Sequence, residues 1–428
     1  MQGKNKGIRL WARNILFFVH EYFLPQRPPG FLNAVLAPRL EFKFKKIFKS
    51  KRSVLTLIIS SLLLYAGVFY SRVLGGVAYI SPEEYAPVAS AEDNDDFLLW
   101  EARPDIKVFK YGSPEPVGLN PEQARKVYDF PARGGSGTIA IVGAFGVPNI
   151  EKDINIFSSE YGLSECTLLS GCLEVQGGTT RIDPNWALTI TGAAEWAHVV
   201  APDAKLLIVI SPTNKLSDLL GSVNYARNRQ DVVAVSLSWG VKEFAEESSY
   251  NHHFKSQTGA VFFGQLGESG THWPAVSPYV ISVGGTTLHW RDNGVFDKET
   301  AWSHSEGGVS KYEPEPSYQR RYGVPNAGGK RVVPDVAINA DPASGYSVYL
   351  STPYRGQKGW LQVGGTGMGP ALWAGLYSHN FLYGHESLYV SKIELRDITR
   401  GSNKNCLFYC SAKIGFDYLT GLGSPSGI

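Results

Sequence analysis

The central part of the chain alternates short, uninterrupted apolar runs with longer segments of helical character. Helical stretches such as 186–200 and 216–227 separate several of these runs. The runs are bounded by Gly, Asp, Ser or Pro and comprise residues 138–142, 206–210, 232–237, 260–263 and 279–283. Runs without polar alternation are typical of strands buried on both faces of a sheet. The order predicts an α/β domain with a mostly parallel central sheet flanked by helices, and a ligand site at the carboxyl ends of the strands.

One charge-free segment nearer the N-terminus predicts a transmembrane helix. Residues 53–71 carry no charged side chain, and about 20 apolar residues suffice to cross a bilayer as a helix. Lys and Arg are concentrated in residues 39–52, before the span, and acidic residues follow it between 83 and 96. This asymmetry predicts a cytoplasmic N-terminus and an extracytoplasmic C-terminal domain. The alternatives are a buried core helix and an uncleaved secretory signal, although a signal peptide seldom begins so far into a chain.

We therefore expect four parts. Residues 1–52 form a basic cytoplasmic or juxtamembrane segment, and residues 53–80 the transmembrane helix and its exit. Residues 81–116 are acidic and rich in proline, as in a linker. Residues 117–428 form the folded extracytoplasmic domain. The formal net charge of +2 gives no reason to expect nucleic acid as a partner, whereas the span makes the lipid bilayer one.

The four cysteines all lie beyond the predicted span, at Cys166, Cys172, Cys406 and Cys410. In an oxidising compartment they can form two short-range disulfides or can cross-pair, and three connectivities are possible. A zinc site with four cysteine ligands is the alternative. The two spacings, with five and three intervening residues, are not those of a typical zinc knuckle.

A glycine-rich turn that leads into a helix occurs near the end of the domain. This segment, Thr366-Gly-Met-Gly-Pro-Ala-Leu-Trp-Ala-Gly375, resembles the Gly-Thr-Ser-x-x-x-Pro segment of the sedolisins, which are serine-carboxyl peptidases with a subtilisin-like three-layer fold. Pro370 comes one position early, and Ala371 stands where the family's proline would be. The other matches follow the family's order within residues 117–428, at Leu119–Tyr128, Glu195–Pro202, Ser236–Gly240, Gly267–Gly270, Ser277–Leu288, Pro334–Val336 and Gly415–Pro425.

The resemblance implies a catalytic centre of four side chains. In the family a Glu acts as general base to a serine nucleophile, an Asp one helical turn later supports it, and a protonated Asp stabilises the oxyanion. The matching positions here are Thr189 for the Glu, Ala193 for the Asp, Gly367 for the serine and Glu268 for the oxyanion Asp. Three of the four side chains are absent, and the fourth is longer by a methylene group. The hydroxyl of Thr366 is adjacent, but we expect it to point elsewhere and to have no base at position 189.

We therefore expect a catalytically degenerate homologue that acts as a protein-binding or scaffolding subunit of a membrane-associated complex. The alternatives are an active serine-carboxyl endopeptidase with unconventional catalytic residues and a purely structural subunit. The histidine in Glu195-Trp-Ala-His198 is interpreted as a packing or helix-end residue.

The resemblance also implies a structural calcium site near the C-terminus. Asp397 and Asp417 would supply carboxylate oxygens, and Ile398, Lys413 and Gly415 would supply backbone carbonyls. Hard oxygen ligands of this kind suit Ca²⁺. The alternative is that the two aspartates only cap turns.

Overall fold

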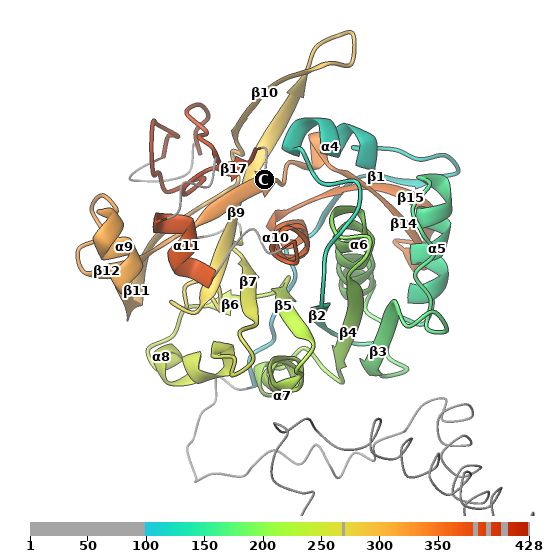
Figure 1. The fold of residues 1–428 in the computed structure, drawn as a ribbon, viewed down its shortest axis with the longest axis horizontal. Helices are drawn as coiled ribbons and strands as arrows, with labels where there is room; N and C mark the ends of the chain where they lie inside the picture. The colour runs from blue at the N-terminus through green and yellow to red at the C-terminus, as the bar shows by residue number, and fades with distance from the viewer. Residues whose placement is uncertain (1–98, 268–269, 380–383, 391–394, 404–409, 427–428) are drawn as a thin grey trace, which may run out of the picture. The chain divides into compact units, whose positions relative to one another are not determined.

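The computed structural model describes residues 99–267, 270–379, 384–390, 395–403 and 410–426 (Figure 1). The predicted transmembrane helix at 53–71, the first half of the predicted linker, Glu268 and Cys406 lie outside these residues. Over the ranges that are described, no helix is both long enough and apolar enough to cross a membrane.

The centre of the domain is an eight-stranded sheet with the order β10-β9-β7-β5-β2-β4-β3, and β13 also pairs with β9. All neighbours are parallel except β10 and β9. The strands are β2 (Thr138–Ala144), β3 (Leu173–Gly177), β4 (Lys205–Ser211), β5 (Val232–Leu237), β7 (Val261–Gln265), β9 (Val280–Trp290), β10 (Phe296–Ala301) and β13 (Val336–Asn339). Each of the five apolar runs falls on one of them, and every residue of β2 is buried. The predicted parallel sheet is confirmed.

Helices cover both faces of this sheet (Figure 1). One face packs against α6 (Pro184–Val200) and α10 (Gly369–Tyr377), which also contact each other, and the other face against α7 (Leu216–Asn228). Asp183 caps the N-terminus of α6, and its carboxylate accepts hydrogen bonds from the backbone N–H groups of Asn185 and Trp186 in the first turn. All residues from Trp186 to Val200 are buried, as expected for a helix that is apolar on every side.

A second, antiparallel sheet lies on the far side of α6, which explains why this helix is buried all round. Its order is β1-β15-β14, with β1 (Lys107–Ser113), β14 (Tyr346–Tyr354) and β15 (Gln357–Gly364). Helices α6 and α5 (Ile150–Glu160) both pack against β14. Strand β1 lies within residues 81–116, which the sequence suggested to be a linker, so the folded domain includes the last part of that segment.

Two buried carboxyl groups bond the edge of β14 that does not pair with β15. Glu195 of α6 accepts hydrogen bonds from the backbone N–H of Tyr349, and Asp153 of α5 accepts one from that of Ser351. Burial raises the pKa of both carboxyls, because desolvation penalises the charged form.

The remaining elements complete the domain. They are α4 (Pro121–Tyr128), α8 (Glu247–Tyr250), α9 (Ser317–Tyr322), α11 (Gly384–Val390), the 3-10 helices η3 (Asn251–Phe254), η4 (Pro342–Ser344) and η5 (Thr366–Met368), and the strand pairs β6 (Val241–Lys242) with β8 (His272–Trp273), β11 (Gly308–Pro314) with β12 (Lys330–Val333), and β16 (Leu395–Arg396) with β17 (Ser424–Pro425). A disulfide joins Cys166 and Cys172, so this short-range pair is confirmed and a zinc site of four cysteines is not formed. Cys410 is disulfide-bonded as well.

Candidate functional site

The glycine-rich segment forms a tight corner between β15 and α10. Gly365 has φ +100, a value that favours glycine. A side chain at this position would also meet the backbone, because an added Cβ would lie 2.3 Å from the carbonyl oxygen of Asp105. The chain then forms η5 and enters α10, with Pro370 in the first turn. The expected turn-and-helix geometry is present.

In the structure this corner lies next to the two positions on α6 that match the family's catalytic Glu and Asp. Thr189 and Ala193 both lie on α6 and are buried. Between them, Gly192 faces Met368 of η5, whose sulfur would lie 3.3 Å from an added Cβ. The hydroxyl of Thr189 donates to the carbonyl oxygen of Asn185 one turn earlier, at 2.8 Å. No carboxylate is present at either position, so the helix offers no general base there.

Glu268, the position aligned to the oxyanion aspartate, lies outside the described residues. The preceding residue, Gly267, is beside the corner, because its backbone N–H donates to the hydroxyl of Thr366 at 3.0 Å. The loop that carries Glu268 therefore starts next to the position of the expected nucleophile.

A stretch of the same chain crosses the edge of the sheet beside these residues. Residues 99–106, here called the cleft segment, run across the carboxyl ends of β4, β5 and β7, with isolated β-bridges at Glu101 and Arg103. Near β4, Ala102 donates to the carbonyl oxygen of Asn214 at 2.8 Å. Beyond β5, Arg103 and Gly240 exchange two backbone hydrogen bonds of 3.1 Å, as in an antiparallel pair. The edge of the sheet at which the sequence predicts a ligand site is thus crossed, at β4, β5 and β7, by backbone of the same molecule.

Side chains from the domain fix the far end of the cleft segment. At the end of β7, the Gln265 amide donates to the carbonyl oxygen of Arg103 at 3.1 Å and accepts from the N–H of Asp105 at 2.9 Å. The Asp105 carboxylate accepts from the backbone N–H and the hydroxyl of Thr366, at 2.8 and 2.6 Å. The Thr366 hydroxyl therefore faces the carboxylate of Asp105, a neighbour that the sequence did not predict, while position 189 offers no base, as expected.

The backbone of the cleft segment occupies the space that a nucleophile's side chain would need. Gly367 donates its N–H to the carbonyl oxygen of Asp105 at 3.0 Å. A Cβ added at Gly367 would lie 2.6 Å from that oxygen and 3.0 Å from the Oε1 atom of Gln265. The position therefore accepts glycine and excludes serine in this arrangement.

Sequence reasoning missed the cleft segment. Asp105 is 160 residues from Gln265 and 261 from Thr366, and extended backbone that bonds to distant groups has no periodic pattern of its own. The one available signal was the pair of glycines at 365 and 367, which indicates a close approach of another backbone.

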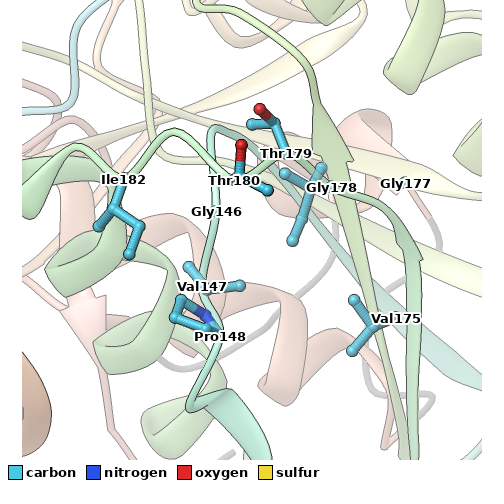
Figure 2. Close-up of a pocket in the computed structure, with 10 residues that line it drawn as sticks. Gly146, Val147, Pro148, Val175, Gly177, Gly178, Thr179, Thr180 and Ile182 are labelled. Carbon is cyan, nitrogen blue, oxygen red and sulfur yellow. The ribbon is translucent and has the colours of Figure 1, made fainter.

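An apolar pocket of about 220 Å³ lies at the same edge of the sheet, beyond the ends of β2 and β3 (Figure 2). Val147, Pro148, Val175, Ile182 and Ile210 supply apolar side chains to its wall. None of its lining residues is titratable, so the pocket can accommodate an apolar group but supplies no acid or base.

The residues expected to bind calcium lie together at a different place. Lys413 donates its N–H to the Oδ2 atom of Asp417 at 3.2 Å, and Gly415 donates its N–H to the Oδ2 atom of Asp397 at 2.8 Å. Asp417 and Ile398 are buried. Both carboxylates therefore accept hydrogen bonds from the backbone of one loop, and the calcium site stays a prediction. The groups of Lys413 and Gly415 that reach them are N–H donors, a geometry that also fits the alternative of turn capping.

Comparisons with known proteins place the fold and then the family. No family model matches the chain. Among solved structures, a Pseudomonas sedolisin, described as a serine-carboxyl proteinase complexed with two molecules of pseudo-iodotyrostatin, aligns with a TM-score of 0.62 at 24% identity, over 73% of this chain and 96% of that one. The described domain thus has the subtilisin-like α/β fold.

The curated relatives give the family. The chain is 30% identical to kumamolisin of Bacillus sp. (strain MN-32), over 74% of this chain and 63% of the relative. It is 26% identical to sedolisin of Pseudomonas sp. (strain 101), over 72% of this chain and 60% of the relative. It is a homologue of the sedolisin family, and it spans less than two thirds of the length of these relatives.

Proposed function

We propose that the protein is a non-catalytic sedolisin-like pseudopeptidase, anchored in a membrane by residues 53–71. In this proposal it serves as a protein-binding or scaffolding subunit of a membrane-associated complex. The observation that carries the loss of catalysis is the contact at Gly367. There the carbonyl oxygen of Asp105 stands 2.6 Å from the point where a serine Cβ would begin.

The helix supports the same conclusion. A serine nucleophile depends on its base, and removal of one member of such a unit removes most of the rate. The Thr189 hydroxyl donates to a backbone carbonyl of its own helix, and the Ala193 side chain has no polar atom. Nucleophile, base and supporting carboxylate are thus all replaced by groups that pack or bond locally.

The test is an assay of the full-length protein against a denatured protein substrate from acid to neutral pH. We expect no cleavage above that of the buffer blank at any pH. Cleavage that disappears in Glu268→Ala would overturn the proposal, because this change removes the remaining acidic side chain of the aligned set.

One observation favours an active peptidase as the second candidate. The Thr366 hydroxyl donates to the Asp105 carboxylate at 2.6 Å, which is the geometry of a hydroxyl with an adjacent base. The side chain of Thr366 is buried, however, so a substrate would have to displace the cleft segment that carries Asp105. Activity that is retained in Thr366→Ser and lost in Thr366→Val would support this candidate over a pseudopeptidase.

The membrane anchor and the scaffolding role need separate tests. We expect the full chain to stay with membranes after alkaline extraction and to be released when residues 53–71 are replaced by a polar linker. Partners captured from solubilised membranes should persist when residues 1–52 are deleted, if the folded domain holds them. Loss of all partners on that deletion would favour the purely structural alternative, in which the N-terminal region makes the contacts.

We also propose that Asp397 and Asp417 hold a structural Ca²⁺ together with carbonyl oxygens of Ile398, Lys413 and Gly415. The support is the convergence of both carboxylates on one short loop and the preference of Ca²⁺ for oxygen ligands. A ligand that binds only the folded state raises its stability, so a chelator should lower the melting temperature. No change with chelator, in both the wild type and Asp397→Ala, would leave turn capping as the role of these residues.

A further inference from the structure

A histidine from α6 lies against the disulfide that closes the loop between α5 and β3. Cys166, Cys172 and His198 place their ligand atoms within 4.8 Å of one another, and they are the one such group of three among the described residues. The cleft and the proposed calcium site involve other residues. The cluster has no part in the function proposed above.

The imidazole of His198 is oriented by a backbone group. Its Nε2 atom lies 2.9 Å from the carbonyl oxygen of Ser164. A carbonyl oxygen can only accept, so Nε2 carries the proton and Nδ1 carries the lone pair. His198 is buried, and its Nδ1 atom has no hydrogen-bond partner in the described structure. Orientation of one ring nitrogen by a carbonyl, with the other left as a bare lone pair, is the arrangement of metal-binding histidines.

The two cysteines are held in place by bonds that do not involve their sulfur atoms. The Asn155 amide donates to the Cys166 carbonyl at 3.0 Å and accepts from its N–H at 2.9 Å. The carbonyl of Cys172 accepts from the N–H of Leu206 at 2.7 Å. The Cα atoms are 5.0 Å apart. The sulfur atoms would therefore stay close together if the bond between them were broken.

The loop can accommodate that change. Its tip is exposed, with Leu169 98% accessible to solvent, while Cys166 at its start is fully buried in the core. Around tetrahedral Zn²⁺, with Zn–S of about 2.3 Å and Zn–N of about 2.0 Å, the sulfurs lie ~3.8 Å apart and ~3.5 Å from the nitrogen. These separations are within the reach of the cluster. Cys172 is half-buried, and a water molecule would complete the four ligands of the ion.

We propose that Cys166, Cys172 and His198 form a thiol-controlled site for a soft divalent cation, Zn²⁺, which is closed by the disulfide and opened by its reduction. Two molecules of a low-molecular-weight thiol supply two electrons and two protons. The S–S bond breaks, both cysteines become thiols, and the reductant leaves as its own disulfide. Zn²⁺ then displaces the two thiol protons to solvent and forms two Zn–S bonds and one Zn–N bond. The site reports the redox state of its surroundings whether or not the domain has lost catalysis.

The experiment uses the full-length chain with Cys406→Ser and Cys410→Ser, so that one cysteine pair remains. The protein is reduced with a phosphine, freed of reductant without air and titrated with Zn²⁺ against a chromophoric chelator. We expect about one Zn²⁺ per chain after reduction and none before it. Co²⁺ in place of Zn²⁺ should show the intense charge-transfer absorption of thiolate ligands.

Two variants distinguish this site from a structural disulfide beside a packing histidine. His198→Gln should weaken Zn²⁺ binding by at least about tenfold and alter the Co²⁺ spectrum, and Cys172→Ser should abolish binding. Melting of the oxidised His198→Gln protein checks that it folds, and Cys172→Ser serves on its own if it does not. Absence of Zn²⁺ binding by the reduced protein, or equal affinity in His198→Gln, would overturn the proposal.

Discussion

Substitution of Gly367 by alanine tests whether the cleft segment fills the place of the nucleophile. The added Cβ would lie 2.6 Å from the Asp105 carbonyl oxygen and 3.0 Å from Gln265 Oε1, so the backbone of the cleft segment must move. Overpacking of this kind costs about 1–3 kcal/mol, and loss of the 3.0 Å hydrogen bond from Gly367 to Asp105 costs about 0.5–1.5 kcal/mol. We expect a loss of roughly 2–4 kcal/mol in the free energy of unfolding.

Urea denaturation measures this loss, and limited proteolysis with mass spectrometry measures the release of residues 99–113. Gly221, in the interior of α7, is the matched control, because an added Cβ there meets nothing within 4 Å. Gly221→Ala should be neutral or should stabilise the protein by up to about 1 kcal/mol. If Gly367→Ala is no less stable than Gly221→Ala, and proteolysis within 99–113 is unchanged, the reasoning is refuted.

Three further changes test one bond at the site and two buried carboxyl groups elsewhere in the domain. Asp105→Ala should lower the free energy of unfolding by about 1.5–3 kcal/mol, because it removes the carboxylate that accepts two hydrogen bonds from Thr366. The control in the same urea series is Asp292→Ala, at an exposed hairpin tip, which should change that free energy by less than about 0.5 kcal/mol. Burial raises the pKa of Glu247 from 4.5 to about 9, so the folded state favours the protonated form and loses stability as the pH rises from the lower value to the higher. Glu247→Gln should remove this loss, which reaches roughly 3 kcal/mol at pH 7 as an upper bound, and melting curves from pH 4 to 9 that keep the wild-type slope would contradict it. Burial also raises the pKa of Glu195, so Glu195→Gln, which keeps an acceptor for β14, should raise the melting temperature at neutral pH relative to wild type and not at pH 4.

Much of the fold could be predicted because the order of apolar and polar residues along a segment shows which of its faces are buried. The run 138–142 gave β2, and the stretch 186–200 gave the body of α6. The cysteine spacing allowed the short-range pair Cys166–Cys172 among three connectivities. The turn around Gly367 was recognised as a corner before a helix. The reason for a glycine at position 367 could not be derived. The family resemblance shows that the serine side chain is absent, but it does not show which atoms lie in its place.

The sequence by itself determined the parallel sheet, the apolar central helix and the absence of a serine, a glutamate and an aspartate at the aligned positions. Only the tertiary structure decided that residues 99–106 cross the carboxyl edge of the sheet, that Asp105 faces Thr366, and that His198 lies beside a disulfide. The physical reason is that side-chain patterns are local, whereas the backbone hydrogen bonds between distant segments are not. The alternation of apolar and polar side chains follows from which face of an element is buried and repeats locally. A backbone N–H or C=O has the same chemistry at nearly every residue, so its partner across the fold is settled only when the whole chain has packed.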